Sequence, residues 1–158
     1  MADVSDSPDA VTDALLSASR LLVAISARSI AAVDETITIP QFRTLVILRT
    51  RGPMNLATLA GLLDVQPSTT GRMVDRLVTS GLIDRRSHPG SRRELLVELT
   101  ARGRDTVDAV TASRREEIAA IVAEMPQRQR HGLIRALNAF TSAGGESTVG
   151  SSGDDLVL

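Results

Sequence analysis

The 158-residue chain contains no cysteine, and this absence excludes disulfide bonds, thiolate zinc sites and redox switches based on thiols. Only two histidines, His88 and His131, could supply imidazole ligands, and they lie far apart in the sequence. A transition-metal site is therefore not expected, although carboxylates could still hold a hard cation. The chain also has no tyrosine, tryptophan or lysine, which shortens the list of catalytic and stacking side chains.

Long apolar runs and a secretory leader are also missing from the chain. No apolar run approaches the roughly 18–20 residues that a transmembrane helix needs. The first ten residues, MADVSDSPDA, are acidic and lack the basic-then-apolar pattern of a signal peptide. A length of 158 residues, with 42% hydrophobic and 23% charged residues, fits one globular domain with a buried core. We therefore expect a cytoplasmic, one-domain protein without a membrane partner.

Motifs of catalysis are absent as well. The sequence shows no nucleophile–base pair, no glycine-rich phosphate loop and no paired metal-ligand motif. It therefore argues against an enzyme and predicts neither a cofactor nor a metal site.

The charge is distributed unevenly along the chain. The net charge is −1, but residues 41–104 carry eleven arginines against five acidic residues, a net charge of +6. The remaining residues carry seven arginines against fourteen acidic residues, a net charge of −7. All 18 basic residues are arginine; codon bias in a GC-rich genome is the simpler explanation, although arginine also binds phosphate and guanine better than lysine does. One basic segment inside an acidic frame predicts a localised phosphate-binding surface.

Apolar residues recur at helical spacing on both sides of this basic segment. The predicted helices cover residues 9–35 with Asp9 as cap, residues 38–52, about 25 residues after Thr100, and a last helix that Pro126 opens. Residues 1–8 are polar, and residues 144–158 have the glycine- and serine-rich composition of a linker. We expect both ends of the chain to be loose.

Two short helices and a hairpin are predicted between the flanking helices. The helices cover residues 56–64 and 67–80, and the strands cover residues 82–86 and 94–100 on either side of a turn at 88–90. This order predicts a mainly α protein with a small β-hairpin wing. We interpret it as a winged helix-turn-helix inside a helical frame.

The second short helix carries polar groups suited to DNA. Asp64 tolerates the left-handed conformation that the turn before it needs, and Val65 is expected to plug that turn. The helix starts at Pro67, so the backbone N–H groups of residues 68–70 are expected to be free for phosphate. The expected DNA-contacting residues of this helix are Gln66, Ser68, Thr69, Thr70, Arg72 and Arg76.

The predicted wing carries four arginines, Arg85, Arg86, Arg92 and Arg93. Four arginines around one tight turn would repel one another without an anionic partner, and a DNA minor groove supplies one. Two alternatives remain. The two short helices could be an amphipathic hairpin without a role in DNA binding, or the winged helix could bind another protein. A protein-binding module should expose apolar residues at these positions instead.

Several segments resemble the MarR family of bacterial regulators. They are Leu59-Ala60, Leu63-Asp64-Val65, residues 72–77, residues 81–86, Arg92-Arg93, Leu99-Thr100 and Gly103, with Pro40-Gln41, Val46 and Leu48 resembling the start of that family's second helix. The resemblance covers residues 9–143, and its most specific part is residues 75–103. It implies dimerisation helices at about 9–36 and 104–143 around a winged helix-turn-helix at about 40–103.

The resemblance also implies partners and regulation. It implies a homodimer that binds double-stranded DNA at a palindromic operator and represses its own or a neighbouring gene. Many relatives release the DNA when a small aromatic ligand binds; Arg20, Arg28, Phe42 and Arg43 lie in suitable segments, but nothing in the sequence singles them out. The candidate dimer contacts are Leu15, Leu16, Leu133, Leu137 and Phe140.

Two positions depart from the family pattern. Ser91 stands where the family usually has an acidic residue that braces a wing arginine, so Arg92 and Arg93 are either freer or braced by Glu94. Gly71 stands where serine or threonine is common, at a cost of about 1 kcal/mol relative to alanine in a helix. Either close approach of the backbone to DNA or simple drift explains this glycine.

Overall fold

The computed structural model describes residues 6–145. The predictions of a loose N-terminus and a loose C-terminal tail fall largely on residues 1–5 and 146–158, outside this described part. The elements are α1 Pro8–Val33, α2 Ile39–Arg51, β1 Met54–Asn55, α3 Leu56–Leu63, α4 Pro67–Thr79, β2 Ile83–His88, β3 Ser91–Leu99, α5 Ala101–Glu124, α6 Gln127–Arg130 and α7 Leu133–Ala143.

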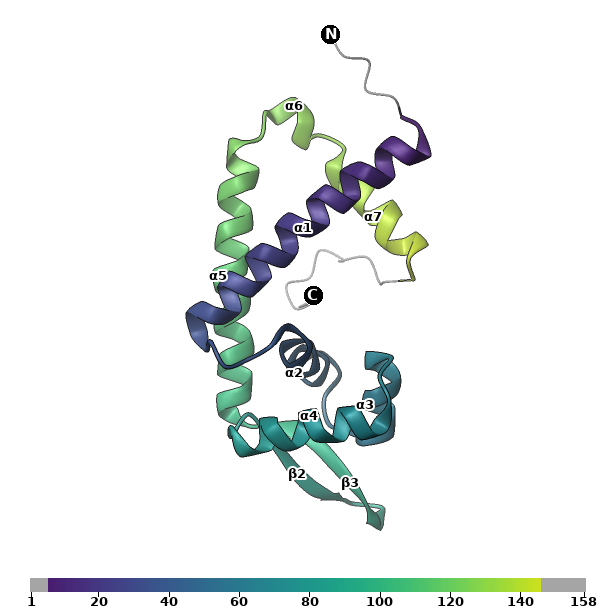
Figure 1. Ribbon diagram of the computed structural model, residues 1–158, viewed down its shortest axis with the longest axis vertical. Helices are drawn as coiled ribbons and strands as arrows, with labels where there is room; N and C mark the ends of the chain where they lie inside the picture. The colour runs from purple at the N-terminus through teal and green to yellow at the C-terminus, as the bar shows by residue number, and fades with distance from the viewer. Residues whose placement is uncertain (1–5, 146–158) are drawn as a thin grey trace.

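Helices α2, α3 and α4 pack with a three-stranded sheet into a head at one end of the molecule (Figure 1). The sheet is antiparallel in the order β1-β3-β2, with Val97 of β3 between Met54 of β1 and Arg85 of β2. The core beneath it includes Leu45, Leu59, Val74, Leu77 and Ile83, none more than 1% exposed. The mainly α fold with a small β wing, predicted from the sequence, is confirmed.

Local chemistry accounts for the helix starts. Thr38 caps α2 through a capping box, in which its side chain accepts from the Gln41 amide and the Gln41 side chain accepts from the Thr38 amide. The predicted cap of α1, Asp9, is wrong. Ser7 is the cap because Pro8 fits the first helical turn without an N–H, and the Ser7 hydroxyl accepts from the Ala10 amide.

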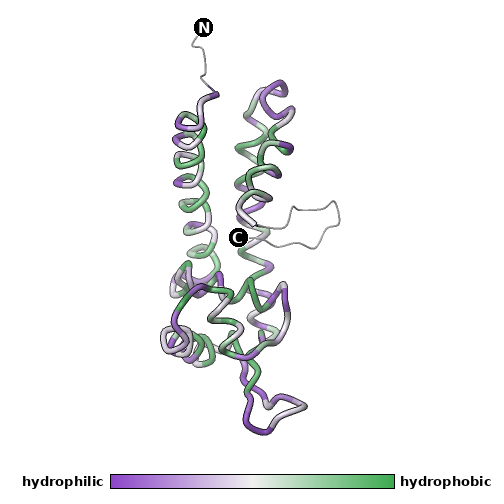
Figure 2. Tube along the Cα trace, turned by 90° about the vertical axis from the view of Figure 1, so that its right-hand side faces the viewer, coloured by the Kyte–Doolittle hydropathy of each residue, from purple (hydrophilic) through white to green (hydrophobic). Residues whose placement is uncertain are grey.

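Two long helices rise from the head, and α1 packs on α5 near its own C-terminal end (Figure 1). Figure 2 shows the remainder of α1 standing apart from α6 and α7. The buried residues of α1 are confined to the stretch from Ile25 to Ile30, and α7 has none. We call the part of α1 before Ile25 and the whole of α7 the two arms. Among the described residues, no element covers the apolar surface of these arms.

The single last helix predicted after Pro126 is wrong, because the chain forms α6 and then α7. Gly132, at φ 87°, adopts a left-handed conformation between them, and this conformation ends one helix before the next begins. His131 is the C-cap of α6 and is exposed.

Helix α1 is long and apolar enough to cross a membrane by length and composition alone. Its 18-residue window reaches a mean hydropathy of 1.4, because alanine and serine rather than charged residues separate its leucines and valines. The expectation that no apolar segment approaches the length of a transmembrane helix is therefore wrong for α1.

Candidate nucleic-acid interface

The turn between α3 and α4 has the expected geometry. Asp64 is left-handed, at φ 53° and ψ 45°, and is the one non-glycine residue with positive φ in the described part of the chain. An aspartate tolerates this conformation better than a branched residue does. Val65 follows it and packs, partly buried, against the core of the head. The turn thus sets the start of α4 against α3 as the sequence predicts.

The first turn of α4 presents unpaired polar groups. Gln66 is the N-cap but makes no capping hydrogen bond with its side chain. The amides of Ser68 and Thr69 have no protein acceptor among residues 6–145, and both side chains are exposed. Free amides at a helix N-terminus carry partial positive charge and bind anionic oxygens.

Thr70 was predicted to contact DNA, and the structure contradicts this. Its side chain is 0% exposed, its hydroxyl donates to the Gln66 carbonyl at 3.2 Å, and its amide donates to the same carbonyl at 3.0 Å. Thr70 lies one turn before Val74 on the core side of α4, so helical geometry turns it inward. It stabilises the helix start and leaves the interface to its neighbours.

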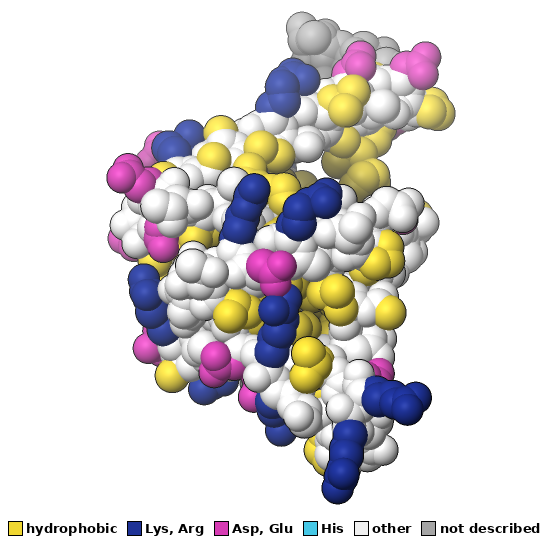
Figure 3. Space-filling model, turned by 60° about the horizontal axis from the view of Figure 1, so that its bottom comes forward, with side chains coloured by type: hydrophobic (Ala, Val, Ile, Leu, Met, Phe, Trp, Pro, Cys, Tyr) yellow, Lys and Arg dark blue, Asp and Glu magenta, His cyan; other side chains and the backbone are white. Residues whose placement is uncertain are grey.

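The outer face of α4 is polar and basic, whereas its inner face is apolar. The exposed polar residues on the outer face include Gln66, Ser68, Thr69, Arg72, Asp75 and Arg76. Val74 and Leu77 lie on the opposite side at 0% and 1% exposure. Figure 3 views the molecule from the head, where basic side chains gather over α4 and the wing.

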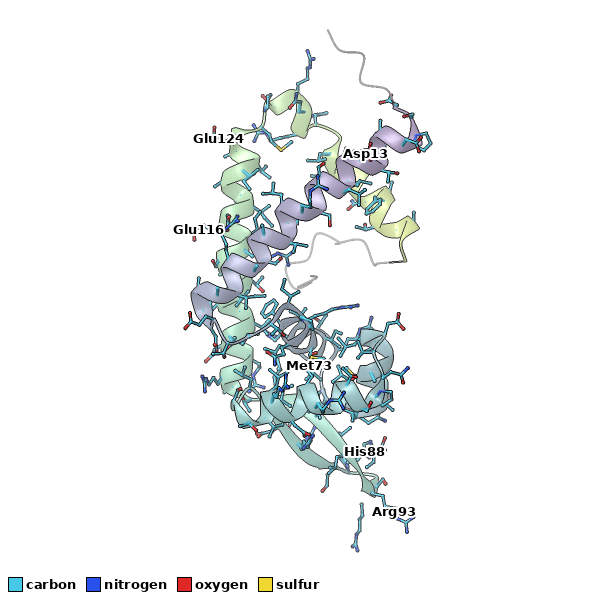
Figure 4. The ribbon with its side chains drawn as sticks, in the orientation of Figure 1. Asp13, Met73, His88, Arg93, Glu116 and Glu124 are labelled. Carbon is cyan, nitrogen blue, oxygen red and sulfur yellow. The ribbon has the colours of Figure 1, made fainter. Side chains whose placement is uncertain are left out.

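The wing consists of β2 and β3, and the turn between them is tighter than predicted. The strands extend to His88 and from Ser91, so Arg92 and Arg93 lie on β3 rather than in the turn. The Gly90 amide donates to His88 Nδ1 at 2.9 Å, and this bond orders the tip. Figure 4 shows His88 and Arg93 at the tip, farthest from the helical arms.

The four wing arginines divide into two pairs. Arg85 is bonded to Asp75 of α4, and the Nε of Arg86 lies 3.2 Å from an Oε2 of Glu98 on the same sheet. Arg92 and Arg93 are exposed, and their side chains have no ion-pair partner in the part of the chain that the structure describes. Two arginines are thus held by protein carboxylates, and two project freely.

Ser91 does not replace the bracing carboxylate of the family. Its hydroxyl accepts a hydrogen bond from the Arg93 backbone amide at 3.3 Å and leaves the guanidinium alone. Glu94, the other bracing candidate, accepts instead from the side chain of Asn55 at 2.5 Å. The sequence left open whether Arg92 and Arg93 are free or are braced by Glu94. The geometry favours free side chains for both arginines.

Gly71 lies on α4, is half-buried and has room for a side chain. A Cβ added there would meet only the end of the Leu56 side chain, at 3.5 Å, which is an ordinary contact. Packing within the chain therefore does not require glycine at this position.

The four effector candidates are not brought together. Arg20 donates to Ser17 at 3.0 Å, Arg28 pairs with Glu117 of α5, and Phe42 is a core residue at 2% exposure. Arg43 is exposed on α2.

The candidate dimer contacts lie on the two arms. Leu16, Leu137 and Phe140 are exposed at 54%, 44% and 56%, and Leu15 and Leu133 are half-buried. The sequence interpretation missed Ile134, which at 73% is the most exposed large apolar residue of α7. Its helical spacing with Leu137 was the signal available, but spacing alone does not tell which face finds a partner.

Three further features of the interface were missed. They are strand β1, the bond from Asn55 to Glu94, and the pairing of Asp75 with Arg85. A two-residue strand has no periodicity to detect, and neither side-chain pair is close in sequence. Only the packing of the wing on the head reveals them.

The sequence and the fold of this chain are similar to those of known proteins. The sequence model of the MarR family matches residues 37–95. The crystal structure of RV1404 from Mycobacterium tuberculosis is 70% identical, with a TM-score of 0.84 over 92% of this chain and 100% of that chain. The transcriptional repressor NicR of Pseudomonas putida is 36% identical over 85 residues, and this match spans 54% of each chain, about half of that relative.

A more distant structure carries DNA. It is a mutant MepR of S. aureus bound to an oligodeoxyribonucleotide, 18% identical, with a TM-score of 0.63 over 84% of this chain and 96% of that chain. At this identity the likeness concerns the fold alone.

Proposed function

The chain belongs to the MarR family of transcriptional regulators, and from this membership we propose that it is a repressor that binds a palindromic DNA operator as a homodimer. The observation that carries the proposal is the shared orientation of two basic surfaces, the outer face of α4 and the tip of the wing (Figure 3). In this proposal the gene controlled is its own or a neighbouring one, and the protein acts in the cytoplasm.

We assign α4 to the major groove and call it the recognition helix. Arg72 and Arg76 are exposed on its outer face, where a guanidinium can bind the O6 and N7 of guanine. Gln66 is suited to adenine, whereas Ser68 and Thr69 are less selective and lie beside the free amides that receive phosphate. This division predicts base preference from the arginines and positioning from the helix start.

We assign the wing to the minor groove. The side chains of Arg92 and Arg93 need no protein bond to be broken before they bind phosphate or enter the groove. Arg85 and Arg86 already have carboxylate partners, so we expect them to hold the wing in place and contribute less to DNA contacts.

The exposed apolar surface supports the homodimer. Leu16 on α1 and Ile134, Leu137 and Phe140 on α7 are 44–73% exposed, and large apolar surface left to water marks an interaction site. A second copy would cover these residues and present two recognition helices to two half-sites about one helical turn apart. The dimerisation helices would then be those at about 9–36 and 104–143, with the reading head at about 40–103.

A fluorescence titration with the duplex upstream of the protein's own gene tests the proposal. Binding should be specific against a scrambled duplex of equal length, and its affinity should fall steeply as salt rises, because phosphate binding releases counterions. Equal affinity for the scrambled duplex, or no binding at low salt, would contradict it. In the second case a protein-binding winged helix becomes the better explanation. Repeating the titration with aromatic acids tests release by a small ligand.

A further inference from the structure

The start of α5 is joined to the end of the recognition helix by close backbone contacts. A Cβ built on Gly103 would lie 2.2 Å from the Leu82 carbonyl oxygen, so the two backbones are closer than any other residue type permits. The Thr100 amide donates to that same carbonyl at 3.1 Å. The Thr100 hydroxyl donates to the Gly81 carbonyl at 2.7 Å and accepts from the Gly103 amide at 3.0 Å.

One charged side chain spans this junction. Arg102 of α5 donates from Nη1 to the carbonyl of Ser80, the C-cap of α4, at 3.1 Å. The same nitrogen lies 3.7 Å from the Cβ position of Gly81, so the guanidinium lies directly over the end of the recognition helix. A helix C-terminus carries partial negative charge, which favours a cation there.

The charge of Arg102 also acts on the end of α1. Asp34 is the C-cap of α1, and its carboxylate accepts from the Thr36 hydroxyl at 2.6 Å and from the Thr36 amide at 2.9 Å. These two bonds lower the pKa of Asp34, and the positive charge of Arg102 lowers it further. Arg102 therefore bonds to the end of α4 and acts electrostatically on the end of α1.

We propose that Arg102 is a positioning residue that sets the angle between the recognition helix α4 and the long helix α5. The proposal rests on the proposed function, because the angle matters only if α4 reads DNA. In a dimer built through α1, α5 and α7, the long helices carry the two heads. A small change in the angle between α4 and α5 would therefore change the distance between the two recognition helices at the DNA. Arg102 does not itself have to contact DNA.

Arg104 provides the matched control. It is exposed on the same turn of α5, and its Nη1 donates to the Leu99 carbonyl at 3.0 Å. That carbonyl belongs to the chain immediately before α5 and not to α4. Arg102→Met and Arg104→Met remove the same charge and the same number of bonds to carbonyl oxygens, but only the first breaks a link to the recognition helix.

The first experiment needs no DNA. Because the chain has no cysteine, Thr79→Cys on α4 and Ala112→Cys on α5, both exposed, place two spin labels in an otherwise unlabelled chain. The labelled protein is diluted with unlabelled protein so that only distances within one chain are measured. Arg102→Met should broaden the distance distribution between the labels, and Arg104→Met should leave it unchanged. An unchanged distribution in Arg102→Met, or equal broadening in both variants, would overturn the proposal.

The second experiment uses duplexes selected from a random pool by the unmodified protein. Arg102→Met should lower affinity for the selected duplex by up to about tenfold, because DNA binding must then fix an α4 angle that the Arg102–Ser80 bond already fixes in the unmodified protein. The loss should be smaller for a duplex with one base pair inserted between the half-sites. The ratio of the two affinities, which measures discrimination by half-site spacing, should therefore be smaller for Arg102→Met than for the unmodified protein. Retained discrimination in Arg102→Met would count against the proposal.

The two measurements separate the possible failures. If no duplex is selected, the proposed function fails, while the label distances still decide the role of Arg102. Circular dichroism checks that each variant is folded. If Arg102→Met does not fold, Arg102→Gln, which keeps a polar side chain too short to reach Ser80, takes its place.

Discussion

The guanidinium of Arg85 on β2 is bonded to the carboxylate of Asp75 on the recognition helix. The two groups are 38% and 60% exposed, ten residues apart in sequence and on different elements. Since Arg85 and Val97 are directly opposite in the sheet, Arg85 lies on the face of the wing that packs toward the core. The wing and the recognition helix are thus held as one unit by this pair.

This ion pair predicts coupled effects on operator binding. Asp75→Ala and Arg85→Ala should each weaken binding, and the double variant should be less affected than the sum of the two. Because both groups are partly exposed, we expect a coupling of about 0.5 kcal/mol, as for other surface pairs. A double-mutant cycle by fluorescence titration measures it. The Arg86–Glu98 pair, confined to the sheet, is the control and should show no coupling to Asp75.

The unpaired wing arginines predict loss of affinity without loss of specificity. Arg92→Ala and Arg93→Ala should weaken binding to all duplexes, and each should lower the slope of log affinity against log salt by about 1. Arg128→Ala, an exposed arginine on α6 far from the head, should change neither quantity. An unchanged salt slope in both wing variants would place the wing away from the phosphates.

Arg72 predicts a change in base preference. Its guanidinium is exposed on the outer face of α4 and makes only a long bond, 3.4 Å, to the Thr69 hydroxyl. Arg72→Ala should cost about 1–3 kcal/mol at the preferred base and relax the choice at that position. Selection from a random duplex pool with both proteins measures this. Identical selected sequences would remove Arg72 from base reading and contradict the placement of α4.

Two glycines predict opposite effects on stability. Gly103→Ala forces a Cβ to within 2.2 Å of the Leu82 carbonyl, so it should destabilise the fold by about 1–3 kcal/mol or more. Gly61→Ala on α3, with open space around its Cβ position, should stabilise by up to about 1 kcal/mol, since alanine favours the helix. Urea unfolding of both variants measures the free energies. Shifts of the same sign would contradict the close backbone approach at Gly103.

The exposed apolar arms predict a dimer that a charge can break. Ile134→Asp places a carboxylate on the most exposed large apolar residue of α7 and should shift the protein toward a monomer, because an interface core disfavours unpaired charge. Sedimentation equilibrium measures the shift. Leu95→Asp, on an apolar residue of the wing that is 52% exposed, should leave the oligomeric state as it was. A monomer in the unmodified protein would contradict the proposed dimer directly.

Much of the local structure follows from the sequence because its causes are local. The helix-turn-helix was predictable from Asp64, Val65 and Pro67, since turn geometry and the missing proline N–H act within a few residues. The same holds for the capping of α2 by Thr38. The break at Gly132 also had a local signal, the glycine itself, which the interpretation as one helix overlooked.

The winged helix-turn-helix and its basic surface could thus be determined from the sequence alone, because periodicity, turn residues and the position of arginines are properties of neighbouring residues. The tertiary structure determines which of these residues are accessible for DNA contacts. It buried Thr70 against the core, bonded Arg85 to Asp75, and left Arg92 and Arg93 free at the wing tip. Those outcomes depend on contacts between the wing, the recognition helix and the head, and such contacts form only when distant segments pack together.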